Sequence, residues 1–167
     1  DFLKRLHLSR GDLSICRHSL SAFPFGSGDN FYDHDGGSLR LAFLRPPLEF
    51  RRISSVFTRA RFHPVLGITR KHEGTDYAAD IGTPVRAAGE GVVVRAGRAG
   101  GYGNLIELRH RNGVTTRYGH LSRILVHAGE RVSQGERIGL VGMTGLATGP
   151  HLHYEFRVNG VAQDSRR

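Results

Sequence analysis

The sequence predicts an all-β fold, a sandwich or a barrel built from short strands. Between residues 82 and 142, short runs of Val, Ile and Leu are separated by glycines at close, regular intervals. Asn112-Gly113 lies between two strand-like segments, residues 105–110 and 115–120, which is a strong hairpin signal. Glycine contributes 23 of the 167 residues, so we expect many turns and no long helices. Short strands with this spacing are typical of sandwiches and barrels.

The length of the chain suits one domain with an additional segment. At 167 residues it can bury one core. Residues 1–45 are weakly patterned and contain the loop signal Gly26-Ser27-Gly28, so we interpret them as the remnant of a preceding domain and a linker that could cap the site. Residues 46–167 are predicted to form the main domain. The chain begins at Asp1, and we expect it to be a piece of a longer protein, with any membrane anchor before Asp1.

The composition limits the classes of binding partner but does not identify one. The formal net charge is +9, and only Lys4 and Lys71 are lysines, so arginine supplies most of the positive charge. That balance suits an anionic partner such as nucleic acid, anionic lipid or an acidic wall polymer, or simply a solvated basic surface. The chain has no aromatic-rich basic strand motif, so we expect no nucleic-acid partner. Cys16 is the only cysteine, which excludes an internal disulfide and a Cys-rich zinc site.

A strand near the C-terminus carries the main chemical signal. With the two-residue period of a strand, Leu152 and Tyr154 fall on one face, while His151, His153 and Glu155 fall on the other. An apolar row is what a core requires, but a row of imidazoles opposite it is not explained by packing. Imidazole is a common zinc ligand, so His151 and His153 are predicted to be a metal or catalytic pair.

A second cluster lies at residues 72–79. In a fully extended strand, the Cα atoms of His72 and Asp76 would be about 13 Å apart, too far for both side chains to bind one ion. A bend at Gly74 would bring the two side chains together. The pattern resembles the His-Glu-x-x-His motif of helical zinc peptidases. Asp76 occupies its last position, however, and Gly74-Thr75 makes a helix implausible, so we place Glu73 outside the chemistry.

The residues alone therefore suggest a hydrolytic metal site. His72, Asp76 and His153 are candidate ligands, and two histidines with one carboxylate leave a coordination position open, as catalytic zinc sites do. His151 and His120, which ends a predicted hairpin strand, remain as candidates to accept and return a proton. The other histidines with a simpler structural explanation are His34, His63, His110 and His127.

Separate motifs, in order and at matching separations, resemble one known family. These motifs are His72-x-Gly-x-Asp76, Gly82-Thr-Pro-Val85, Gly100-Gly-Tyr-Gly-Asn104, Tyr118-Gly-His120-Leu-Ser122 and Thr148-Gly-Pro-His151-Leu-His153. On these motifs the chain is similar to the lysostaphin-type (LytM-like) zinc endopeptidases of peptidoglycan, metallopeptidase family 23, over residues 31–164.

The resemblance implies antiparallel β-sheets in a sandwich-like catalytic domain, with few short helices and a zinc groove. It implies one Zn²⁺ held by His72, Asp76 and His153, with His120 and His151 activating water and stabilising the tetrahedral intermediate. The implied substrate is a peptide cross-link of peptidoglycan, the D-alanyl–diaminopimelate bond in envelope members. We therefore expect a monomer on the periplasmic side of a Gram-negative envelope.

Other interpretations stay open from the sequence. The chain could be a family member that binds the wall without cutting, is autoinhibited by residues 1–45, or activates another hydrolase. A lipoyl-type carrier domain would need a lysine at a hairpin tip, and no lysine follows Lys71. Glu155 could hold a ligand imidazole, or it could form a surface ion pair with Arg157.

Overall fold

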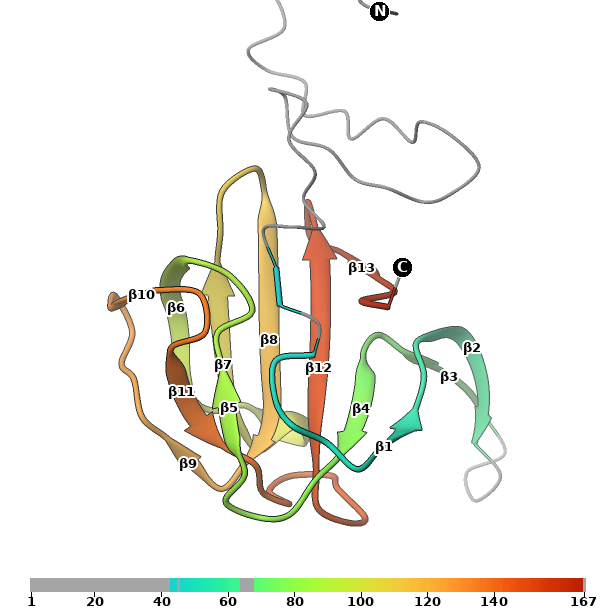
Figure 1. The fold of residues 1–167 in the computed structure, drawn as a ribbon. Helices are drawn as coiled ribbons and strands as arrows, with labels where there is room; N and C mark the ends of the chain where they lie inside the picture. Colours follow the sequence, from blue (N-terminus) through green and yellow to red (C-terminus); the bar gives the residue numbers. More distant parts are fainter. Residues whose placement is uncertain (1–42, 45, 64–67, 167) are drawn as a thin grey trace, which may run out of the picture.

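The computed structural model describes residues 43–44, 46–63 and 68–166, with only the backbone of residues 59–63 and 68–70. Its centre is a long antiparallel sheet in the order β1-β4-β12-β8-β7-β6-β10, with β13 added beside β12 (Figure 1). These strands are β1 (Arg52–Ser55), β4 (Thr75–Ala78), β6 (Gly91–Arg98), β7 (Asn104–Arg109), β8 (Val114–Leu121), β10 (Arg131–Val132), β12 (His151–Val158) and β13 (Val161–Gln163).

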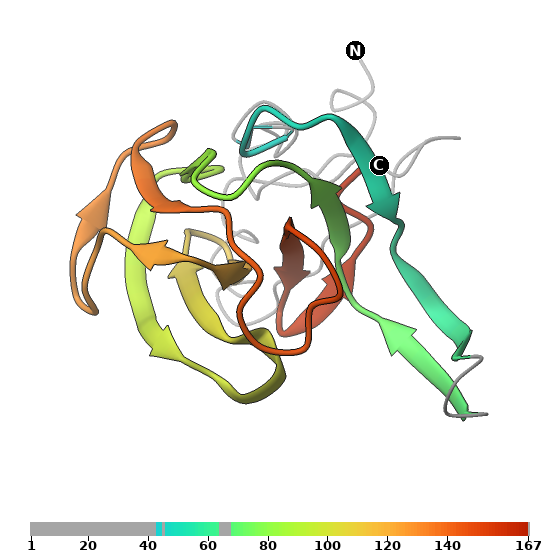
Figure 2. The same cartoon turned by 90° about the horizontal axis from the view of Figure 1, so that it is seen from below.

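Smaller sheets complete the domain. One has the order β5-β11-β9 and lies over one face of the large sheet (Figures 1 and 2). Its strands are β5 (Pro84–Arg86), β9 (Arg123–Ile124) and β11 (Arg137–Leu140), and β2 (Thr58–His63) pairs with β3 (Ile68–His72) in a separate ribbon. The only helical element in the described residues is a 3₁₀ turn at Gly100–Tyr102. The prediction of antiparallel β-sheets with little helix is confirmed.

The core lies between the large sheet and the β5-β11-β9 sheet. Val85 and Ile138 of the small sheet are completely buried in one cluster with Ile106, Leu108 and Tyr118 of the large sheet. Alternation along the strands explains this arrangement, because every second side chain of β7 and β8 points to the same face. The core therefore fixes β8 and β12 side by side, and His120, His151 and His153 extend from their adjoining ends.

The predicted hairpin forms where the sequence placed it. β7 and β8 pair antiparallel, and Asn112 and Gly113 between them have φ values of 56° and 69°. Two consecutive positive φ values are what a type I′ turn requires, and Asn and Gly are the residues that adopt them most readily. No helix within the described residues is long and apolar enough to cross a membrane.

Candidate metal centre

Strand register places Asp76 beside His153. β4 and β12 pair antiparallel with Asp76 directly opposite His153, so their side chains project from the same face of the sheet. The Nδ1 atom of His153 lies 2.8 Å from Oδ1 of Asp76. This contact joins residues that are 77 positions apart in the chain, which is why the sequence pattern alone could not establish it.

A bend at Gly74 brings His72 to the same place. β3 ends at His72 and β4 begins at Thr75, and the Nε2 atom of His72 lies 3.1 Å from Oδ2 of Asp76. A Cβ atom at position 74 would lie 2.6 Å from the carbonyl oxygen of Tyr154 and 2.7 Å from the His153 ring. Glycine is therefore required here by close packing, and the predicted bend is confirmed.

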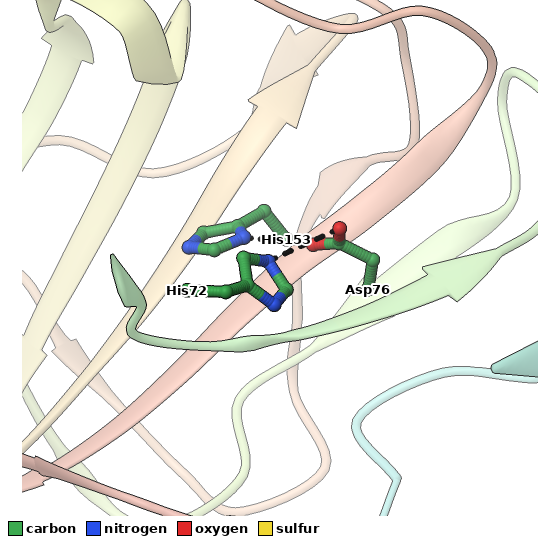
Figure 3. Close-up of side chains that lie close together, drawn as sticks. All are labelled: His72, Asp76 and His153. Atoms are coloured by element: carbon green, nitrogen blue, oxygen red, sulfur yellow. Dashed lines mark hydrogen bonds and ion pairs between the residues drawn. The ribbon is translucent and has the colours of Figure 1, made fainter. Parts of the chain in front are cut away.

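The donor atoms of His72, Asp76 and His153 fit a zinc ion. All three lie within 4.8 Å of one another, and Figure 3 shows both imidazoles directed toward the carboxylate. Two nitrogens and one oxygen are a zinc donor set that leaves a position for substrate or water.

His120 and His151 stand beside this cluster, at the end of β8 and the start of β12. Their ring centroids are 4.7 Å apart, and His120 is 5.8 Å from His153 by the same measure. Nδ1 of His120 lies 2.8 Å from the carbonyl oxygen of Thr144, and Nδ1 of His151 lies 2.8 Å from that of Gly149. A carbonyl can only accept, so each ring carries its proton on Nδ1 and its lone pair on Nε2. Nε2 of His151 lies 3.8 Å from Oδ1 of Asp76.

His120 adopts a backbone conformation that few non-glycine residues use. Its φ is +61°, in the left-handed region, where strained residues cluster at functional sites. The chain then turns over Gly142, where a Cβ atom would lie 2.3 Å from the backbone nitrogen of Ser122 and 2.8 Å from the His120 carbonyl oxygen. The backbone at His120 is therefore tightly packed against Gly142, and its ring lies beside that of His151.

Electrostatic interactions link the side chains of this candidate metal cluster and shift their pKa values. Burial favours neutral Asp76, yet hydrogen bonds from His153 and His72 outweigh it and hold the Asp76 pKa well below its usual value. Burial likewise opposes charge on His153, but Asp76 and Glu155 outweigh it and raise its pKa to about 9. Burial lowers the pKa of His120, and the hydrogen bond to Thr144, which raises it, offsets only part of this effect. This imidazole is therefore neutral near pH 7.

Glu155 makes both of the contacts that the sequence left open. Its Oε1 lies 3.1 Å from Nε2 of His153, and its Oε2 accepts a hydrogen bond of 2.6 Å from Arg157. The side chain is only 1% exposed, so the pair with Arg157 is buried and is not a surface ion pair. Burial favours the neutral acid, but bonds from His153, Tyr102 and Arg157 lower the Glu155 pKa to about 2.

Tyr102 and Arg117 also belong to the site, and sequence reasoning assigned them no role. The Tyr102 hydroxyl donates to Oε1 of Glu155 over 2.6 Å, and Arg117 lies with its guanidinium carbon 6.0 Å from the Tyr102 ring centroid. The available signal was the single aromatic residue inside a glycine-rich loop. Glu73, placed outside the chemistry, instead accepts a 3.0 Å bond from Arg157.

The glycine-rich loop that holds Tyr102 is fastened to the loop before β12. The backbone nitrogen of Asn104 donates to Oγ1 of Thr144 over 3.0 Å, and Leu146 donates to the Gly101 carbonyl over 2.8 Å. A Cβ atom at Gly103 would lie 2.4 Å from Thr144. Close contact between the loops explains the glycine at position 103, and the loop places the Tyr102 ring centroid 5.6 Å from that of His153.

The remaining histidines differ in their surroundings. His110 is buried, 8% exposed, within the domain core. His127 is exposed and pairs with Glu130, its Nδ1 lying 2.7 Å from the carboxylate. His34 and the His63 side chain lie outside the described part of the structure.

Comparison with known proteins places the chain in a family. The sequence profile of peptidase family M23 matches residues 70–165, more than half of the chain and all of the cluster described above. The chain belongs to peptidase family M23. The resemblance predicted from the motifs is therefore confirmed.

Individual M23 relatives agree closely in sequence. Peptidoglycan DD-endopeptidase ShyC of Vibrio cholerae serotype O1 is 53% identical over 137 residues, which cover 82% of this chain and 32% of that protein. DD-carboxypeptidase/endopeptidase Mpg of Neisseria meningitidis serogroup B is 53% identical over 130 residues, or 77% of this chain and 30% of that protein. The chain thus spans about a third of the length of these curated relatives.

Solved peptidase structures agree with this chain in fold. A zinc-containing peptidase from Vibrio cholerae is 41% identical with a TM-score of 0.75, covering 85% of this chain and 44% of that one. The catalytic domain of lysostaphin from Staphylococcus simulans is 35% identical with a TM-score of 0.60, covering 69% of this chain and 89% of that one.

Proposed function

We propose that this chain is the catalytic part of a zinc-dependent endopeptidase that hydrolyses peptide cross-links of bacterial peptidoglycan, the D-alanyl–diaminopimelate bond in particular. The observation that carries the proposal is the convergence of His72, Asp76 and His153, whose donor atoms lie within 4.8 Å of one another, next to His120 and His151. The names of relatives such as ShyC support the substrate class.

In this proposal His72, Asp76 and His153 hold the ion. When bound, zinc supplies a Lewis acid that polarises a carbonyl oxygen and makes water more acidic. His151 carries its lone pair on Nε2, because its Nδ1–H donates to the Gly149 carbonyl. It can therefore accept the proton of the attacking water and pass it to the leaving amine.

His120 has a complementary role. Its ring is fixed by the Thr144 carbonyl, and burial lowers its pKa, so it meets the substrate as a neutral imidazole. The proton that His151 takes from the attacking water can pass to Nε2 of His120, and the resulting N–H can donate a hydrogen bond to the negative charge on the scissile carbonyl oxygen before the proton goes to the leaving amine. Both side chains are preorganised by backbone contacts, so the geometry requires little adjustment when substrate binds.

The proposed location follows from the substrate. Peptidoglycan lies in the cell envelope, and the named relatives from Vibrio cholerae and Neisseria meningitidis are enzymes of Gram-negative bacteria. We place the activity on the periplasmic side, with the domain acting as a monomer. Residues 1–45 remain a proposed linker and cap, and residues 46–167 the proposed catalytic domain.

The test is digestion of purified, cross-linked sacculi by the zinc-loaded chain, with the released muropeptides identified by mass spectrometry. Loss of dimers with a matching gain of monomers, abolished by a chelator and restored by zinc, would support the proposal and identify the bond. Intact dimers in the presence of stoichiometric zinc would reject catalysis and favour a wall-binding or autoinhibited protein.

A further inference from the structure

His153 is oriented differently from the other histidines of the site. His72, His120 and His151 each place Nδ1 2.8 Å from a backbone carbonyl oxygen, of Val56, Thr144 and Gly149 respectively. His153 instead directs Nδ1 toward Asp76, at 2.8 Å, and places Nε2 3.1 Å from a carboxylate oxygen of Glu155. Its orientation therefore depends on a side chain and not on the backbone.

Glu155 is held rigidly in that position. Its carboxylate is 1% exposed and accepts hydrogen bonds of 2.6 Å from both Tyr102 and Arg157. Arg117 adds a contact at 3.5 Å. A buried carboxylate is stable only when it is paired and hydrogen-bonded, and these contacts provide that on both oxygens.

We propose that Glu155 is a positioning residue that fixes the tautomer of the metal ligand His153. The ionised carboxylate can only accept, so the contact requires the proton on Nε2. The lone pair of the neutral ring is then on Nδ1, the atom that faces Asp76 and the proposed ion. A carboxylate behind a ligand imidazole also makes the ligand more basic and strengthens metal binding. This inference rests on the proposed zinc site.

Arg157 extends the arrangement to the second histidine ligand. Its Nη1 atom donates to Oε2 of Glu155 and, over 3.0 Å, to Oε2 of Glu73. Glu73 directly follows His72, so one guanidinium ties the bend after β3 to the strand that carries His153. Tyr102 connects the same carboxylate to the glycine-rich loop. The alternative is that Glu155 serves only to balance the charge of the neighbouring arginines.

Glu155→Gln and Glu107→Gln, a matched pair of variants, separate these roles. Glu107 accepts a 2.9 Å hydrogen bond from Arg117, so its substitution also removes a partly buried carboxylate partner of an arginine in this sheet. It contacts none of the site histidines among the described residues. We expect Glu155→Gln to weaken zinc binding by about 10–100-fold, measured by competition with a chromophoric chelator. Glu107→Gln should leave the zinc dissociation constant unchanged.

The tautomer can be read in the zinc-loaded wild type, so the test does not depend on the variant folding. Long-range ¹H–¹⁵N correlation spectra should show His153 protonated at Nε2 with a metal-bound Nδ1, and Glu155→Gln should shift the Nε2 proton signal. The inference would be overturned by a His153 ring protonated at Nδ1. It would also be overturned if Glu155→Gln bound zinc with wild-type affinity, or if Glu155→Gln and Glu107→Gln lost zinc affinity equally. If the wild type bound no zinc, both the proposed zinc site and this inference would be rejected. The three outcomes above would reject this inference alone.

Discussion

The imidazole rings of His120 and His151 lie with their centroids 4.7 Å apart, and each donates its Nδ1 proton to a backbone carbonyl. The two rings therefore offer Nε2 lone pairs from adjacent positions beside the candidate metal cluster. Because neither ring belongs to that cluster of close donor atoms, catalysis and metal binding should be separable by mutation.

Replacing His151 with Ala should leave zinc content unchanged and slow cross-link cleavage by about 10²–10⁴-fold, the usual contribution of a positioned acid–base group. Metal analysis after dialysis and a muropeptide digestion assay measure the two quantities. His127→Ala, at an exposed position, is the control and should cleave at the wild-type rate. Wild-type cleavage by His151→Ala would contradict the proton-transfer role.

Replacing His153 with Ala should remove zinc and activity together, because it deletes one of the three proposed ligands. The same dialysis and digestion measurements apply, and added zinc should not restore this variant. By contrast, the chelator-treated wild type should recover activity when zinc is returned. Stoichiometric zinc in dialysed His153→Ala would mean that this side chain is not a ligand.

The sequence predicted the site where local patterns controlled the geometry. Alternation along β12 correctly put His153 and Glu155 on one face, and the Asn112-Gly113 turn was predictable because few residues tolerate two positive φ values. The bend at Gly74 followed from the distance that His72 and Asp76 must span. Each of these inferences depends on neighbours within a few residues.

Contacts between segments that are far apart in the chain could not be predicted from the sequence pattern. The pattern of β12 left Glu155 equally suited to an exposed ion pair, because burial of its face depends on the Tyr102 loop more than fifty positions away. Arg157 likewise reaches Glu73 across 84 positions. Side-chain burial of this kind depends on how loops pack over a sheet, and no period in the sequence encodes that packing.

Gly74→Ala should destabilise the fold and weaken zinc binding. The new methyl group would lie 2.6 Å from the Tyr154 carbonyl and 2.7 Å from the His153 ring, and overpacking of this kind costs about 1–3 kcal/mol. Urea denaturation and chelator competition measure the effects. Gly149→Ala is the control, because a Cβ atom there meets nothing within 4 Å. Equal stability of the two variants would contradict the packing argument.

The buried His110 should make folding stability depend on pH. Its Nδ1 lies 2.6 Å from the Glu90 carbonyl and its Nε2 2.8 Å from Oγ1 of Thr116, and burial lowers its pKa. The unfolded chain, with a histidine pKa of about 6.5, then binds more protons than the folded one at lower pH. The free energy of unfolding should be highest above that value and fall as pH decreases below it.

The variant His110→Asn removes this titration and tests the sign. At pH 8 it should be less stable than the wild type by about 1–3 kcal/mol, because a buried partner of Thr116 is lost. The difference in the free energy of unfolding between the two proteins should become smaller between pH 7 and pH 5. In that range only the wild type is destabilised by preferential protonation of His110 in its unfolded state. Urea denaturation with chelator present removes any zinc contribution, and His127→Asn is the surface control. A difference that stays constant or widens as pH falls would show that folding does not depress the His110 pKa.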